Sequence, residues 1–335
     1  MTWFGFLNCN KPSGMTSRDV VNLVQRRLRK VKVGHAGTLD PLATGVLVLG
    51  LGPAAKLVTH VQAYPKRYIG EFRLGEHSPS EDIETESTCP EGLPIPNRQS
   101  IDDAARSMIG RIRQTPSAFS AIHVDGKRAY ERARNGETFD MPSRKVQVDE
   151  IIVHHYSYPN LTLEITCGSG TYIRSIGADM AKKVGTFAIM TALKRTEIGP
   201  FHEADSIDTA AIKDGNLSDH LLPPTLAVQH LPQVILSTRE IKQAYYGQFI
   251  DIQSTQGPTL ANCTKSTRLS QTHPLNAPSI SVPELAALTE TGELAALLRI
   301  KDDRWHPHRV FPPAKRIAEG SVGAIETNES NHLEG

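Results

Sequence analysis

The stretch "KVGHAGTLDPLATGVLVLGLG", residues 32–52, holds a single acidic residue, Asp40, in a glycine-rich loop that leads into an apolar segment. Asp-Pro is a common turn-forming pair, and Thr38 or Asp40 could cap the segment that follows. A lone carboxylate in such a loop can also serve chemistry, because loops carry many catalytic residues. The local pattern leaves both interpretations of Asp40 open.

The composition is that of an ordinary globular protein. The chain has 335 residues, of which 39% are apolar and 22% charged, enough for two domains or one large one. No apolar run reaches the roughly 20 residues that span a bilayer, and the first residues do not form a signal peptide. The four cysteines are far apart and form no CxxC pair, which argues against disulfide and zinc frameworks. We therefore expect a cytoplasmic protein.

Charge is distributed unevenly along the chain, although the formal net charge is only +1. Residues 18–32 and 111–145 are strongly basic, whereas residues 76–91 are acidic. Local basic clusters bind phosphate groups whatever the net charge. The alternative for each cluster is a solvated helix face.

Hydrophobic periodicity predicts the elements that surround this loop. Residues 20–28 carry an apolar stripe at helical spacing, with Ser17 as the expected cap. Alternating apolar and polar residues predict half-buried strands over 68–74 and 161–167. After "GSG" the period becomes helical, so residues 172–174 lie where a strand turns into a helix, a common place for functional side chains.

The chain is expected to divide into two units. Residues 204–225 are rich in turn formers and indicate a boundary. Beyond them we expect a small, mostly β unit with an irregular excursion at 253–280. The predicted domains are 1–222 and 223–316, followed by a disordered tail at 317–335, which is too polar to fold alone.

The sequence lacks the motifs of several common catalytic and nucleotide-binding sites. There is no GxxxxGK[ST] phosphate loop, no GxSxG elbow and no HExxH helix, and the thirteen histidines lack metal-ligand spacing. Glycoside hydrolysis normally needs two carboxylates about 5–10 Å apart, and Asp40 has no acidic neighbour in its motif.

Five segments resemble, in order and spacing, the TruB family of bacterial tRNA pseudouridine-55 synthases. They are "LNCNKPSGMTSRDVV", "GHAGTLDPLATGVL", "YIGEFRLG", "GRIRQTPSAFSAIHVDGKRAYERARNG" and "CGSGTYIRSIGADM", the last followed by "ALKRTEIGPF". The resemblance covers roughly residues 5–210 and, more weakly, the C-terminal unit. It implies an α+β pseudouridine-synthase catalytic fold, with a mixed, mainly antiparallel sheet and flanking helices. It also implies a small C-terminal PUA-like β domain that binds RNA.

The resemblance implies that Asp40 is the nucleophile, attacking either the base or the sugar. The uridine at position 55 in the T-loop of tRNA would lose its N-glycosidic bond and be rejoined through C5. This isomerisation needs no metal, cofactor or second substrate. The alternatives are a non-catalytic tRNA-binding or folding chaperone and a relative guided by a separate RNA. The "DPLATG" motif and the insertion favour the bacterial, stand-alone form, which needs no guide RNA. We expect a monomer.

Family roles carry over to the positions that match. Arg174 would pair with Asp40, holding it charged and oriented. Tyr68 would stack on the target base, and Tyr172 would line the same pocket. From the residues alone, Arg174 also fits a surface position at a helix start, and Tyr68 also fits a core position on a strand.

Two further positions are implied to contact the substrate. His35 would fill the stack that the flipped base leaves, and Leu193 would pack against the base. A lone histidine in a glycine loop also fits a cap or turn, and a leucine at such spacing also fits the core.

An insertion at about residues 111–147 would grip the T-stem and loop. Its arginines would position RNA through phosphate contacts, which carry little sequence information. The predicted backbone contacts are Arg128, Arg132 and Arg134. Phe119 and His123 stand where the family usually has a tyrosine and a lysine, so we expect the fine contacts of this insertion to differ from the family pattern.

Overall fold

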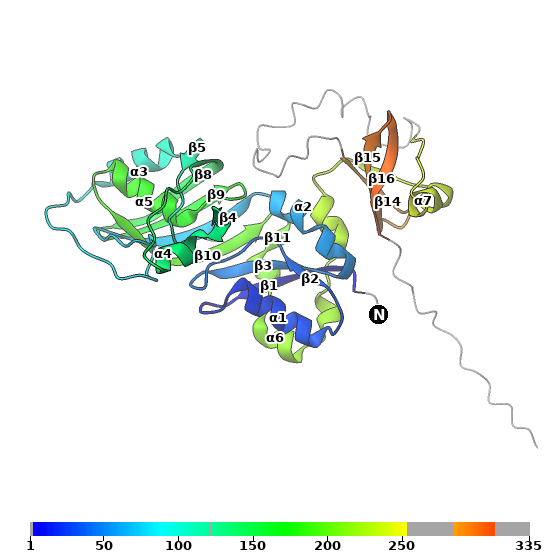
Figure 1. Cartoon of the computed structure of the whole chain (residues 1–335), viewed down its shortest axis with the longest axis horizontal. Coiled ribbons are helices and arrows are strands. Elements are labelled where there is room, and N and C mark those ends of the chain that lie inside the picture. The colour runs from blue at the N-terminus through cyan, green and yellow to red at the C-terminus, as the bar shows by residue number, and fades with distance from the viewer. Residues whose placement is uncertain (1–2, 121, 253–283, 312–335) are drawn as a thin grey trace, which may run out of the picture.

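The computed structural model describes residues 3–120, 122–252 and 284–311. The predicted excursion at 253–280 and the predicted tail at 317–335 therefore both fall wholly outside the described residues. A ten-stranded mixed sheet with flanking helices forms the larger unit, and a four-stranded sheet forms the smaller one (Figure 1). In these described ranges no helix is long and apolar enough to cross a membrane.

The large sheet is mainly antiparallel. Its strands are β1 (Gly5–Lys11), β2 (Val33–His35), β3 (Thr44–Leu51), β4 (Lys66–Leu74), β5 (Gly110–Gln114), β8 (Arg144–Ser157), β9 (Asn160–Cys167), β10 (Ala188–Ile198), β11 (Phe201–His202) and β12 (Ile207–Asp208). The order is β12-β1-β3-β10-β4-β9-β8-β5, with β2 paired to β3 and β11 to β10. The pairs β1–β12 and β3–β10 are parallel. This arrangement confirms the predicted α+β class and both predicted strands.

The first helix, α1 (Ser17–Arg27), is confirmed, but its predicted cap was wrong by one residue. Thr16 is the N-cap, and its side chain accepts a hydrogen bond from the backbone N–H of Asp19. The Asp19 carboxylate accepts one from the N–H of Thr16 in return, so the pair forms a capping box that Ser17 cannot form. Ser17 is instead buried, and its Oγ accepts a hydrogen bond from the N–H of Leu39 at 2.9 Å.

The other helices of this unit cover the sheet in two places (Figure 1). The helices α3 (Arg98–Ser107) and α5 (Ile173–Lys183) contact each other, and α6 (Thr209–Asp214) lies against α1. A Cβ at Gly177 of α5 would lie 2.1 Å from the ring of Phe72, so only glycine lets this helix approach β4 so closely. That contact fixes the start of α5, where Arg174 lies.

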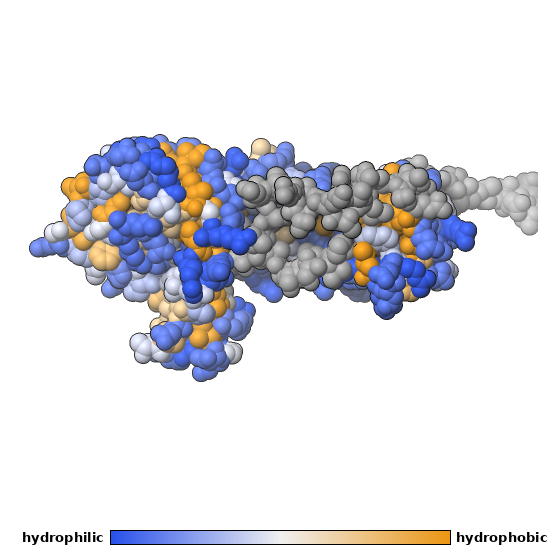
Figure 2. Space-filling view, turned by 90° about the horizontal axis from the view of Figure 1, so that it is seen from above, coloured by the Kyte–Doolittle hydropathy of each residue, from blue (hydrophilic) through white to orange (hydrophobic). Residues whose placement is uncertain are grey.

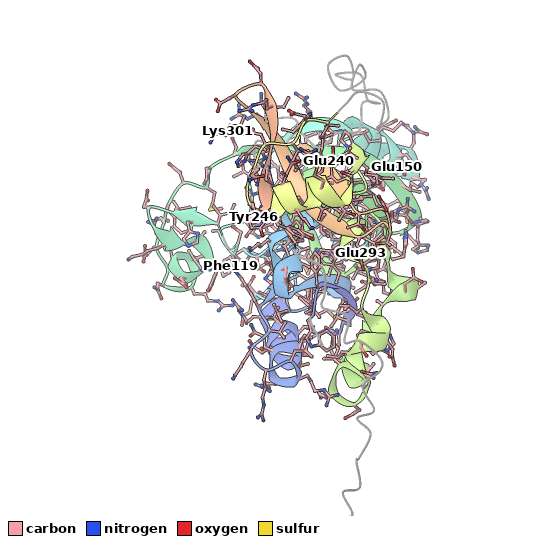
Figure 3. All side chains as sticks on the ribbon, turned by 90° about the vertical axis from the view of Figure 1, so that its right-hand side faces the viewer. Phe119, Glu150, Glu240, Tyr246, Glu293 and Lys301 are labelled. Atoms are coloured by element: carbon pink, nitrogen blue, oxygen red, sulfur yellow. The ribbon has the colours of Figure 1, made fainter. Side chains whose placement is uncertain are left out.

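Residues 115–143, here called the thumb, connect β5 to β8. The thumb contains the short strands β6 (His123–Val124) and β7 (Lys127–Arg128) and the helix α4 (Ala129–Arg134). It projects from the main body as a separate lobe, and Phe119 lies where it joins that body (Figures 2 and 3). The predicted insertion, about 111–147, therefore begins and ends within strands of the large sheet.

The small, mostly β unit predicted beyond residue 225 is confirmed. Its strands are β13 (Gln233–Ile235), β14 (Glu284–Leu288), β15 (Leu294–Lys301) and β16 (Arg304–Val310), in that order, with α7 (Thr238–Tyr245) beside them. One hydrophobic cluster joins it to the larger unit, because Phe6 and Leu57 pack in the same core as Leu297 and Phe311. The helix α2 (Val58–Ala63) lies at this junction (Figure 1).

Candidate active site

The loop that carries Asp40 is anchored by a buried lysine from another part of the chain. The side chain of Lys11 is fully buried, and its Nζ donates to the carbonyl oxygens of Pro41 (3.2 Å), Pro12 (2.9 Å) and Met15 (2.6 Å). Burial lowers the pKa of Lys11 to about 8, although the charge of Asp40 opposes this shift. These contacts fix the backbone directly after Asp40 and leave its side chain 37% exposed.

Arg174 lies between two carboxylates. Its Nε is 3.2 Å from Oδ2 of Asp40, and its Nη1 is 3.1 Å from Oδ2 of Asp82. The same guanidinium donates hydrogen bonds to the carbonyl oxygens of Ser80 (2.9 Å) and Phe119 (3.3 Å). Only 4% of the Arg174 side chain and none of the Asp82 side chain is exposed. The structure thus brings Asp40 and Arg174 together. The other partners of the guanidinium fix it from its buried side.

Asp82 is a site residue that the sequence analysis missed. It lies in the acidic segment 76–91, where it was one of several acidic residues in a segment that differs from the family pattern. In the fold its Oδ1 accepts a hydrogen bond from the N–H of Glu84 at 2.9 Å. The hydroxyl groups of Ser78 and Ser80 both donate to its carbonyl oxygen. The alternating serines were the available signal, since closely spaced hydroxyls often satisfy backbone groups of a tight loop.

Tyr68 and Leu193, which are predicted to contact the target base, lie next to this loop. Both belong to the hydrophobic cluster that includes Leu39 and Ala43, the residues that flank the Asp40 turn. Burial raises the pKa of the Tyr68 phenol, and the nearby charge of Arg195 offsets part of that increase. Leu193 is 7% exposed, so it also serves the core.

Tyr172 immediately precedes α5 and is held through its backbone. Its N–H donates to Oε1 of Gln114 at 2.8 Å, and Nε2 of Gln114 donates to its carbonyl oxygen at 2.9 Å. The guanidinium carbon of Arg144 lies 4.5 Å from the centre of its ring, a distance suited to a cation–π contact. The tyrosine ring is thus paired with a cation at the edge of the thumb.

His35 ends β2, five residues before Asp40. Its ring is half-buried, and burial lowers the pKa of the imidazole, with the charges of Arg18 and Arg195 acting in the same direction. Within the described part of the chain its buried Nδ1 has no hydrogen-bond partner. The flat, half-buried ring is suited to stacking.

The three thumb arginines lie in different environments. Arg132 is largely buried, and it pairs with Asp125 at 3.0 Å and with Glu137 at 2.7 Å. Arg128 and Arg134 are exposed. Arg132 therefore has its charge matched within the thumb, whereas the other two present theirs to solvent.

Solved structures share the fold. A chain of a "Cbf5-Nop10-Gar1 Complex" aligns with a TM-score of 0.65 at 22% identity, covering 93% of this chain and 86% of that one. A chain of an "H/ACA RNP bound to a substrate RNA containing 2'-deoxyuridine" aligns with a TM-score of 0.64, also at 22% identity, covering 93% and 86%. At this identity the similarity establishes the architecture.

The sequence comparisons define the class of protein first. Residues 25–173 match the N-terminal domain of the TruB family pseudouridylate synthases, so the class is that of an isomerase acting on uridine. A "tRNA pseudouridine synthase B" of Rhodopirellula baltica is 38% identical, covering 93% of this chain and 96% of the relative. Another, of Dehalococcoides mccartyi, is 35% identical, with 94% and 99% covered. The chain belongs to the TruB family.

Proposed function

We propose that this protein converts the uridine at position 55 in the T-loop of tRNA to pseudouridine, with Asp40 as the nucleophile. The pairing of a partly exposed Asp40 with a buried Arg174 carries the proposal. It presents an oriented carboxylate to a substrate that approaches from solvent. The two relatives named above, which this chain matches over nearly their whole length, are both named tRNA pseudouridine synthases.

The reaction exchanges one bond for another within a single nucleotide. The bond between N1 and the ribose C1′ breaks, the uracil turns, and C5 bonds to C1′. The proton on C5 leaves and N1 gains one, so the product is an isomer of the substrate. Asp40 attacks either the base or the sugar and is released at the end, so one carboxylate suffices.

The base must leave its stack before Asp40 can reach it, at a cost of a few kcal/mol. Tyr68 and Leu193 supply an apolar wall for the flipped base, and Tyr172 supplies a second ring. His35 takes the place that the base leaves. Arg174 acts through the orientation of Asp40.

Binding of tRNA rests mainly on phosphate contacts. Arg128 and Arg134 of the thumb are exposed and present their charges to solvent, and the basic residues 18–32 are a second source of positive charge. The C-terminal unit, residues 223–316, adds a second RNA-binding surface. The protein acts as a monomer in the cytoplasm and needs no guide RNA.

The decisive experiment is incubation with an unmodified tRNA transcript, followed by pseudouridine-specific chemical labelling and mapping by primer extension. We expect label at position 55 and none in a transcript with cytidine there. Asp40→Asn should lower the single-turnover rate by about 10⁴-fold or more, the scale seen when a central nucleophile is removed. Binding of tRNA should change little.

Asp102→Asn is the matched control, because this aspartate pairs with Arg98 on the exposed face of α3. It should convert tRNA at the wild-type rate. Conversion by a folded Asp40→Asn variant at that same rate would refute the proposed nucleophile. Tight tRNA binding without any product from the wild type would favour the chaperone alternative.

A further inference from the structure

Arg195 on β10 is a buried cation whose partners are unusual. Its side chain is 1% exposed, and no ion pair among the described residues includes it. Its Nε donates to the carbonyl oxygen of Val46 at 2.8 Å, and its Nη2 donates to that of Gly37 at 3.2 Å. Buried arginines are normally paired with carboxylates, so a guanidinium held by carbonyl oxygens needs an explanation.

The two carbonyl groups lie on opposite sides of Asp40 in the sequence. Gly37 comes before it at the start of the loop, and Val46 comes after it within β3. A single planar group therefore joins the two arms of the loop that presents the nucleophile. The backbone of Arg195 also confines this loop, since a Cβ at Gly45 would lie 2.2 Å from its carbonyl oxygen.

Arg195 also faces Tyr68. The two residues are register partners between β10 and β4, and Arg195 is likewise the partner of Gly45 between β10 and β3. Its guanidinium carbon lies 6.0 Å from the centre of the Tyr68 ring. One residue thus lies between the loop of Asp40 and the ring expected to stack on the base.

We propose that Arg195 is a positioning residue, which holds the Asp40 loop and Tyr68 in one fixed arrangement. The inference rests on the proposed function, because it concerns the same nucleophile. The fork of the guanidinium is the essential property, since two donors fixed in one plane set the separation of the two carbonyl oxygens. A lysine keeps the charge, but its three N–H donors all lie on one rotatable atom at the end of a flexible chain, which does not reproduce this fixed planar geometry.

The test uses the full chain with Arg195→Lys, and with Arg195→Gln as a second variant that keeps an amide donor without charge. Single-turnover pseudouridine formation is measured at saturating tRNA, together with filter binding and a thermal melt. We expect Arg195→Lys to bind tRNA within about threefold of wild type and to react about 10²-fold more slowly, the loss expected for a misplaced catalytic group.

Hydrogen exchange supplies a readout that a general structural role would not produce. Amides of residues 36–46 should exchange faster in the variants, while those of β9 and the C-terminal sheet should match wild type. Lys194→Gln is the matched control, because this lysine is adjacent on β10 but exposed and paired with Glu203. This variant should form pseudouridine at the wild-type rate once it is saturated with tRNA.

Wild-type rates in a folded Arg195→Lys variant would overturn the inference. So would faster exchange spread evenly over the protein, with activity restored on cooling, because this pattern describes a stability defect. If Arg195→Lys does not fold, the same criteria apply to Arg195→Gln. Lack of product from the wild type would instead refute the proposed function, and with it the reaction on which this inference rests.

Discussion

Arg174 is almost completely buried, with 4% of its side chain exposed, yet its partner Asp40 keeps 37% of its side chain open to solvent. The pair is therefore asymmetric: the cation is fixed in the fold and the anion faces solvent. Asp82 and the carbonyl oxygen of Ser80 hold the guanidinium from its buried side. The direction in which Asp40 points is thus set before RNA arrives, as electrostatic preorganisation requires.

This asymmetry predicts the effect of Asp82→Asn. The amide oxygen can still accept the hydrogen bond from the N–H of Glu84, but the charge that holds Arg174 is lost. Arg174 should then shift toward Asp40, and pseudouridine formation should slow by about 10²-fold. The free energy of unfolding should fall by about 1.5–3 kcal/mol, the range for a hydrogen bond to a charged group.

Single-turnover kinetics and urea unfolding measure these two effects. Asp179→Asn serves as the control, because Asp179 pairs with Lys182 on the outer side of α5. This variant should change neither the rate of pseudouridine formation nor the free energy of unfolding strongly. A full rate in the Asp82→Asn variant would show that Asp40 alone is enough to orient the guanidinium.

The sequence predicted the residues that lie in ordered motifs and regular elements. The family resemblance singled out Asp40, Tyr68 and Arg174, and a turn motif, a strand period and a helix start then gave each of them a local position. Asp82 could not, because a buried carboxylate in an irregular loop leaves no periodic signal. Its burial depends on Arg174, ninety-two positions further along the chain.

Lys11 and Arg195 were missed for a related reason. Both are long basic side chains whose usual place is the surface, so burial would not be expected from residue type. Each is buried because its polar end satisfies carbonyl oxygens of the Asp40 loop. The position of the cap was missed by one residue because both Thr16 and Ser17 are good capping residues, and only the Asp19 side chain decides between them.

The thumb predicts two different effects for two neighbouring arginines. Arg128→Gln removes an exposed charge, so tRNA binding should weaken and the slope of log K against log salt should flatten by about one unit. Arg132→Gln should leave that slope nearly unchanged, because Asp125 and Glu137 already match the charge. It should instead loosen the thumb and make it more sensitive to limited proteolysis.

Filter binding between low and moderate salt, with proteolysis of the free protein, separates these outcomes. Arg98→Gln on α3 is a control for loss of an exposed charge away from the thumb, since this residue pairs with Asp102. An equal change of slope for Arg128→Gln and Arg132→Gln would mean that Arg132 leaves its partners to bind phosphate.

The junction between the two units contains a buried group of titratable side chains. Glu284 of β14 is fully buried at its side chain and lies 2.9 Å from His308, 3.2 Å from Arg299 and 3.6 Å from His60. Arg309 also faces this group, and its Nη1 donates to the carbonyl oxygen of Lys56 at 2.6 Å. The ring of His230 lies 5.9 Å from that of His60, so cations and imidazoles surround one carboxylate.

This junction predicts that the protein loses stability in mild acid. Burial, with the charges of His230, Arg309, Arg299 and His308, lowers the pKa of His60 to about 4, against 6.5 in the unfolded chain. Between these values the unfolded chain binds the proton and the folded chain does not, so unfolding becomes easier as pH falls. His60 alone should lower the free energy of unfolding by about 1 kcal/mol between pH 6.5 and 5.5, which corresponds to about 2–4 °C in Tm.

Thermal melts of wild type and His60→Gln across this pH window measure the effect, with the exposed His220→Gln as control. The wild type and the control should show the same decline and His60→Gln a shallower one, whereas equal declines in all three would assign the acid sensitivity to other groups.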